Sequence, residues 1–101
     1  MSELAVQCVK DFMTAFGERN ETGMKGYLTS SAKDKFNPGI LEDVRELSDF
    51  SIISQEGNEE SYTVRGQVKV TTPDHQVQTE TWEFKLKKEG DNLLIDSWGE
   101  V

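Results

Sequence analysis

The stretch from Tyr62 to Thr71 reads YTVRGQVKVT, and its polarity alternates almost throughout. Apolar side chains stand at Tyr62, Val64, Val68 and Val70, and polar side chains occupy most of the positions between them. Successive side chains of a β-strand point to opposite faces, so the pattern predicts a strand with one buried face and one solvated face.

Three further strands are expected around this one. One run precedes it at residues 49–56, and two runs follow it, centred on Trp82 and Ile95. Turn-forming residues separate these runs, notably Pro73 and Asp74. The chain therefore predicts four short strands joined by tight turns, which is an antiparallel meander.

The hairpin at residues 73–75 sets the register of the two central strands. A three-residue loop there places Val64 opposite Phe84 and Arg65 opposite Glu83. Apolar side chains then meet apolar ones and opposite charges meet across the strands, which favours this register over its neighbours.

The last hairpin, at residues 89–92, fixes the faces of the sheet. A four-residue loop places Leu86 opposite Ile95. Strict alternation then assigns every side chain to one face. Facing the core we expect Trp82, Phe84, Leu86, Leu93, Ile95 and Ser97, and facing outward we expect Lys85, Lys87, Leu94, Asp96 and Trp98.

The first third of the chain reads as helix. Apolar side chains at a spacing of three to four residues predict a helix over 4–16, with Ser2 as its N-cap. Shorter helices are expected to follow: one capped by Thr22 and carrying Met24, Tyr27 and Leu28, one capped by Ser30 or Ser31, and one across Ile40–Leu47. The fold class is therefore α+β, a single domain over residues 1–101 with N-terminal helices packed on a curved four-stranded antiparallel meander.

Composition excludes several classes of function. The 101 residues carry a formal net charge of −8, which argues against binding to nucleic acid or to anionic membranes. No apolar run is long enough for direct membrane insertion of this segment. Cys8 is the only cysteine, so no intramolecular disulfide forms, and no metal or cofactor motif is present.

Two segments resemble the NTF2-like superfamily, whose fold is a cone of helices against a sheet. Residues 12–28 contain FxxAF and then MxxYL, and residues 89–98 read EGDNLLIDSW, with Leu93 where the family pattern usually has Trp. The chain resembles small bacterial members found as lipoproteins or as extracytoplasmic domains of membrane-anchored proteins. The resemblance implies an extracytoplasmic location, with a cytoplasmic one as the alternative.

Enzymes of this superfamily place Asp, His or Tyr inside the cone. His75 lies in a hairpin turn, and Asp96 is expected on the outer face, paired with a lysine of the third strand. We therefore predict no catalytic residue. A ligand pocket at the open end of the cone would use Glu80, Gln78, Tyr62, Tyr27 and Trp82. Alternatively, the polar pair lies in water and the aromatic side chains are core.

The outer sheet face offers a second candidate surface. Trp98, Leu94 and Val77 are expected there among charged side chains, which predicts a modest contact patch. A weak homodimer, docking of a partner protein, or packing of the C-terminal tail would each explain such a patch. The sequence thus favours a non-catalytic binding or interaction domain, with a sensor or accessory role in a bacterial extracytoplasmic protein as the expected use. The alternatives are a small-molecule-binding protein or enzyme that uses the cone interior, and a structural spacer.

Overall fold

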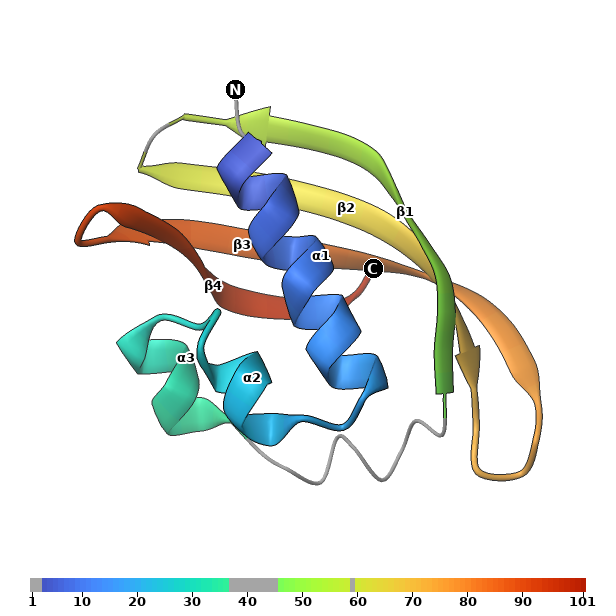
Figure 1. The fold of residues 1–101 in the computed structure, drawn as a ribbon. Coiled ribbons are helices and arrows are strands. Elements are labelled where there is room, and N and C mark those ends of the chain that lie inside the picture. The colour runs from blue at the N-terminus through green and yellow to red at the C-terminus, as the bar shows by residue number, and fades with distance from the viewer. Residues whose placement is uncertain (1–2, 37–45, 59) are drawn as a thin grey trace.

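The computed structural model describes residues 3–36, 46–58 and 60–101. One long helix, α1, lies across a curved sheet, and two short helices, α2 and α3, lie beside it (Figure 1). The elements in order are α1 (Glu3–Gly17), α2 (Glu21–Lys25), α3 (Ser30–Lys35), β1 (Glu46–Gly57), β2 (Ser61–Thr71), β3 (Val77–Glu89) and β4 (Asn92–Glu100). The strands pair in the order β1-β2-β3-β4, all antiparallel. The predicted α+β class and meander are confirmed.

The register of the central strands matches the prediction. Val64 pairs with Phe84 and Arg65 with Glu83. Leu86 pairs with Ile95 across the last hairpin. Alternation with one buried face specifies register strongly, because a slip of one residue would move every apolar side chain of the strand to the solvent-exposed face.

A bulge in β4 overturns the prediction for the end of that strand. The register shifts between Leu86 and Lys85, so that Phe84 pairs with Trp98. One extra residue on β4 reverses the parity of everything after it. Trp98 therefore lies on the inner face, with its ring 4.9 Å from that of Phe12, and Ser97 is exposed. The predicted outward orientation of Trp98 and inward orientation of Ser97 are wrong.

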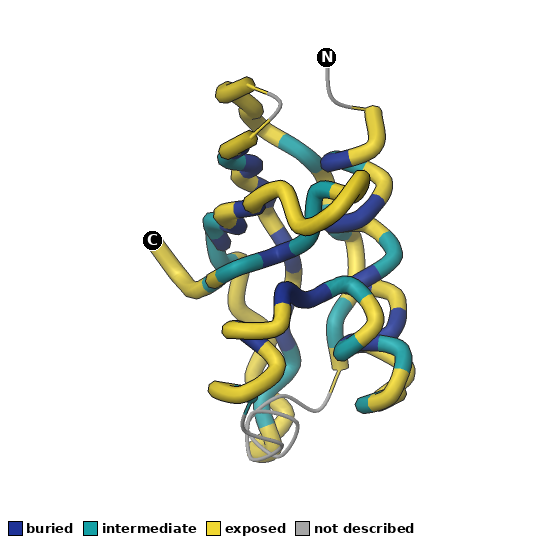
Figure 2. The backbone as a smooth tube through the Cα atoms, turned by 90° about the vertical axis from the view of Figure 1, so that its left-hand side faces the viewer, coloured by how far each residue is buried: buried dark blue, intermediate teal, exposed yellow. Residues whose placement is uncertain are grey.

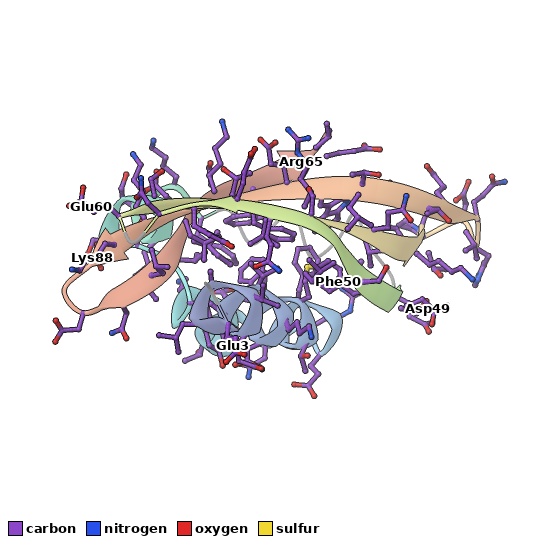
Figure 3. All side chains as sticks on the ribbon, turned by 90° about the horizontal axis from the view of Figure 1, so that it is seen from above. Glu3, Asp49, Phe50, Glu60, Arg65 and Lys88 are labelled. Atoms are coloured by element: carbon purple, nitrogen blue, oxygen red, sulfur yellow. The ribbon has the colours of Figure 1, made fainter. Side chains whose placement is uncertain are left out.

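The core fills the space between α1 and the concave face of the sheet. Buried positions gather where the helix and the strands face each other (Figure 2). Aromatic rings dominate this layer: Phe12 and Phe84 are both fully buried, with ring centroids 6.3 Å apart. The outer face is polar, and Arg65 projects from the side of the sheet away from α1, whereas Phe50 lies toward the helix (Figure 3).

The short helices begin one or two residues earlier than predicted. Asn20, rather than Thr22, caps α2, and its Oδ1 accepts a hydrogen bond from Gly23 N at 3.0 Å. Thr29, rather than either following serine, caps α3. Asn, Ser and Thr are all good N-caps, so neighbouring candidates compete closely.

The chain after α2 runs along β4 instead of continuing as helix. Leu28 forms a parallel bridge with Ile95. Ile95 N donates to Tyr27 O at 2.8 Å, and Thr29 N donates to Ile95 O at 2.9 Å. These bonds tie the α2–α3 segment to the edge of the sheet.

The expected helix across Ile40–Leu47 falls mostly outside the described residues. Leu47 itself lies in β1, which begins at Glu46, three residues before the predicted start of that strand. The N-cap assigned to Ser2 also lies outside the described residues.

Candidate binding groove

Aromatic side chains occupy the interior of the cone. Phe16 and Trp82 pack with ring centroids 5.6 Å apart, and Phe12 contacts both Phe84 and Trp98. These edge-to-face contacts are the arrangement that aromatic side chains prefer in a packed core. Trp82, expected in a ligand wall, is therefore part of the core.

Glu80 lies on the inner face as predicted, but its carboxylate already has a partner. Trp82 Nε1 donates to Glu80 Oε1 at 2.8 Å. Gln78, two residues away, pairs with Val70 and is exposed. The hairpin that carries these residues extends past the helices (Figure 1). Glu80 therefore contacts the rim of the core, and Gln78 lies in solvent.

The two tyrosines lie in different places. Tyr27 O accepts from the backbone of β4, and its side chain borders a hollow with Leu93 and Leu94. Tyr62 belongs to β2 and borders a separate groove. The five side chains expected to form one pocket are therefore not brought together.

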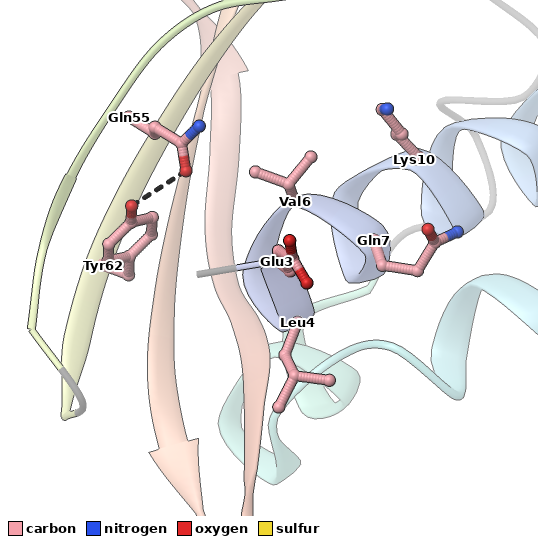
Figure 4. Close-up of a pocket in the computed structure, with 7 residues that line it drawn as sticks. All are labelled: Glu3, Leu4, Val6, Gln7, Lys10, Gln55 and Tyr62. Atoms are coloured by element: carbon pink, nitrogen blue, oxygen red, sulfur yellow. Dashed lines mark hydrogen bonds between the residues drawn. The ribbon is translucent and has the colours of Figure 1, made fainter. Parts of the chain in front are cut away.

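The groove beside Tyr62 has a volume of about 1040 Å³. Figure 4 shows Gln55 and Tyr62 on the sheet side and the N-terminal half of α1 on the other. The α1 side chains that border it are Glu3, Leu4, Val6, Gln7 and Lys10.

The sheet wall of the groove is held by a hydrogen bond. Tyr62 Oη donates to Gln55 Oε1 at 2.9 Å. On the helix wall, Gln7 Nε2 donates to Asp11 Oδ1 at 2.8 Å. Leu4 is 77% exposed, so apolar surface is open to solvent here. The groove therefore offers apolar contact, amide groups and charges in one place.

Sequence reasoning identified only Tyr62 among these residues. A signal for Val6 was available, since it is apolar but falls off the buried stripe that runs through Ala5 and Val9. The sequence carries no such signal for Gln55, because the position of this residue on the inner face depends on two irregularities in the pairing of β1 with β2.

A second, smaller groove continues along the same side of α1. Its volume is about 490 Å³, and Lys10 borders both grooves. Apolar side chains form much of its wall, among them Met13, Leu47 and Phe50. The side of α1 that faces β1 is therefore hollow along much of its length.

The perturbed titratable groups lie away from both grooves. Burial raises the pKa of the Cys8 thiol to about 11, so this thiol stays protonated at neutral pH. Thr29 Oγ1 donates to Asp96 Oδ1 at 2.9 Å, and this bond, with a smaller contribution from Lys87, lowers the pKa of Asp96. The ion pair between Lys87 and Asp96 spans 3.4 Å, which confirms the predicted pairing of Asp96 with a lysine of the third strand.

No group of three or more His, Cys, Asp or Glu side chains in the described ranges could hold a metal ion. Within the same ranges, no helix is both long and apolar enough to cross a membrane.

The outer sheet face carries charges and hydroxyl groups in place of the expected apolar patch. Arg65 and Glu83 form an ion pair at 2.8 Å on this face. Val77 is 64% exposed there, but Trp98 lies on the inner face and Leu94 packs partly against the core. The three residues therefore do not form one surface, because the bulge in β4 removes the aromatic member.

Solved structures match the chain over nearly its whole length. A variant of the protein Rd1NTF2_05 aligns with a TM-score of 0.75 at 14% identity, covering 96% of each chain. An NTF-2 like protein of unknown function from Shewanella oneidensis aligns with a TM-score of 0.71 at 13% identity, covering 98% of this chain and 97% of that one. An Ntf2 like protein involved in plasmid conjugation aligns with a TM-score of 0.66 at 14% identity, covering 99% of this chain and 38% of that one.

These alignments show that the chain has the NTF2-like fold, as the resemblance implied. No protein-family model and no curated protein matches the sequence.

Proposed function

We propose that this protein is a non-catalytic binding domain that holds its ligand in the groove between the N-terminal half of α1 and the β1–β2 edge. The observation that carries the proposal is the filled cone. Phe12 and Phe84 are fully buried and Trp82 nearly so, whereas the groove beside Tyr62 is open to solvent.

The titratable groups support a binding role over catalysis. A general acid or base works best with a pKa near the operating pH and a place in a cleft. Cys8 is protonated at neutral pH and Asp96 is ionised, and neither borders the large groove. The groove itself presents amides, a phenol, apolar side chains and the charges of Glu3 and Lys10, which bind and orient ligands.

The proposal includes an accessory role in a bacterial extracytoplasmic protein. Its support is the resemblance of the chain to small bacterial members of the superfamily and the plasmid-conjugation neighbour, in which the matching region makes up 38% of the chain. Fractionation of source cells, followed by detection with an antibody to the chain, checks the location. A pool confined to the cytoplasm would contradict this part of the proposal.

Amide shifts in ¹⁵N-labelled protein test the groove. A panel of amino acids, sugars, nucleotides and short peptides is added, and the shifts are mapped on the chain. We expect them to gather at Val6, Gln7, Gln55 and Tyr62. Val6→Glu should abolish them by placing a carboxylate in the groove, whereas Val77→Glu, the matched change on the outer face, should leave them intact. Shifts that gather elsewhere, or that survive Val6→Glu, would refute the proposal.

A further inference from the structure

We infer that the groove takes an extended, basic peptide segment of a partner protein, which pairs with the free edge of β1. The inference rests on the proposed function and names its ligand. Among the described strands β1 has β2 as its one neighbour. An edge strand presents unpaired backbone groups, and adding a strand to such an edge is a common way to bind a peptide.

Two hydrogen bonds fix which backbone groups are free. Asn58 N donates to Ser61 O at 2.9 Å, and Lys88 N donates to Glu60 O at 3.0 Å. Hydrogen-bonded and non-bonded pairs alternate along an antiparallel ladder. Counting from either bond, the N–H and C=O groups of Gln55 and Gly57 turn away from β2 toward the open edge.

This free segment is short and lies directly beside the groove. Residues 54–57 pair regularly with β2, whereas the register shifts between Ser48 and Ser51 and again between Ile52 and Ser54. Asp49 also has a positive φ of 53°. Irregularities of this kind protect a long edge from indiscriminate pairing, so we expect the peptide to pair with residues 54–57 alone.

The side chains beside this segment set the pattern of the peptide. Gln55 borders the groove, so the inward side chains of an added strand would lie over Val6 and Leu4. Glu56 pairs with Thr63 on the opposite, outer face, so outward side chains would lie beside its carboxylate. Because side chains alternate between faces, the preferred segment carries alternating apolar and basic residues.

The charge around β1 indicates whether a partner protein or a second copy of this chain pairs with its edge. Three acidic residues lie on the segment or beside the groove, namely Glu3, Glu56 and Glu60, against two described cations, Lys10 and Lys88, the latter bonded through its backbone to Glu60. Pairing of two β1 edges would bring like charges together in a chain of net charge −8, which is destabilising. The same negative charge attracts a basic peptide segment and so favours its binding.

Three synthetic peptides of ten residues test the inference against the full chain. The first alternates lysine and valine, the second has the same composition in two blocks, and the third replaces lysine by glutamate. We expect the first to bind. Hydrogen exchange at the amides of Gln55 and Gly57 should slow on binding, while exchange at Glu56, already paired to β2, should change little. Equal binding of the block peptide would overturn the inference, because it would show attraction by charge alone.

A matched pair of variants isolates the backbone group. Gln55→Ala and Gln55→Pro both remove the partner of Tyr62 Oη, but only proline also removes the N–H that faces the open edge. Proline is tolerated on an edge strand where its missing N–H would face solvent. We expect Gln55→Pro to bind the alternating peptide about fivefold to tenfold more weakly than Gln55→Ala, which corresponds to one hydrogen bond. Equal affinities would overturn the pairing.

The two proposals fail in different ways. Peptide shifts at Val6 and Tyr62 without protection of Gln55 and Gly57 would keep the groove as a binding site and remove strand addition. Absence of shifts at the groove with every probe would remove both. Self-association through β1, seen as a concentration-dependent mass that Glu56→Lys increases, would replace the partner by a second copy and overturn the inference.

Discussion

The two faces of the sheet are made from the same four strands, yet they differ in almost every property. The inner face buries Val64, Phe84 and Ile95 completely, whereas the outer face carries Arg65, Glu83 and exposed lysines. Burial of an aromatic side chain stabilises far more than an exposed ion pair does. The difference indicates that the inner face determines the stability of the fold, and that the outer face chiefly keeps the domain soluble.

Neighbours on β3 give the strongest test of this contrast. Phe84→Ala should lower the free energy of unfolding by about 3–5 kcal/mol, because it leaves a cavity among Phe12, Phe50 and Trp82. Lys85→Ala, one residue later and outward, should change it by less than about 0.5 kcal/mol. Urea denaturation measures both. Similar losses for the two variants would contradict the assignment of the faces.

Trp98 tests where the bulge places the end of β4. Its ring packs against Phe12 but is only partly buried, so Trp98→Ala should cost about 2 kcal/mol, less than Phe84→Ala. Light scattering across a concentration series should give the same mass for the variant and the parent chain. A variant of unchanged stability that associates less than the parent would restore Trp98 to the outer face.

Thr29 tests the junction between the helices and the sheet. Its Oγ1 accepts from Ala32 N at 3.1 Å as the N-cap of α3 and donates to Asp96. Thr29→Ala should therefore destabilise the protein by about 1–2 kcal/mol. Ser31→Ala, also in α3 and exposed, is the control and should have little effect. Denaturation curves compare the two, and an equal effect would show that the cap contributes nothing specific.

Asp96 makes part of this stability depend on pH. Its pKa in the folded protein is lowered from the ordinary value of 3.8, first by the hydrogen bond from Thr29 and then by Lys87. The contribution is therefore fully present above pH 3.8 and lost as the pH falls through the lower, folded value. The stability gap between the parent chain and Asp96→Asn should narrow below pH 3.8. A gap that is constant from pH 7 to pH 2.5 would contradict this.

The sequence was sufficient where two independent constraints agreed. The alternation of β2, together with turn lengths, gave the pairing of Val64 with Phe84 and of Leu86 with Ile95. The prediction of the face on which Trp98 lies was wrong, because a bulge is a backbone irregularity that leaves the polarity pattern of the sequence intact. The N-caps of α2 and α3 were predicted one or two residues too late, because Asn20 and Thr29 lie close to other residues that cap equally well.

The groove could not be predicted from the sequence, for a different reason. Its walls come from Val6 and Gln55, which lie far apart along the chain, and neither is unusual in its local pattern. A hollow is the space that packing leaves, so it depends on how α1 sits on the sheet and not on a motif. The predicted pocket failed similarly, because the volumes of Phe12 and Trp82 fill the cone.

Arg65 provides the smallest expected effect and the test of the outer face. Its ion pair with Glu83 is well formed, with Nε donating at 2.8 Å as well, but about half of the arginine side chain is exposed. Arg65→Ala should cost about 0.2–1 kcal/mol, and the loss should shrink in 1 M salt because exposed charges are screened. Lys69→Ala, which breaks the more exposed 3.3 Å pair with Asp49, should cost less. A loss for Arg65→Ala as large as that for Trp98→Ala, and independent of salt, would mean that the outer face also carries the fold.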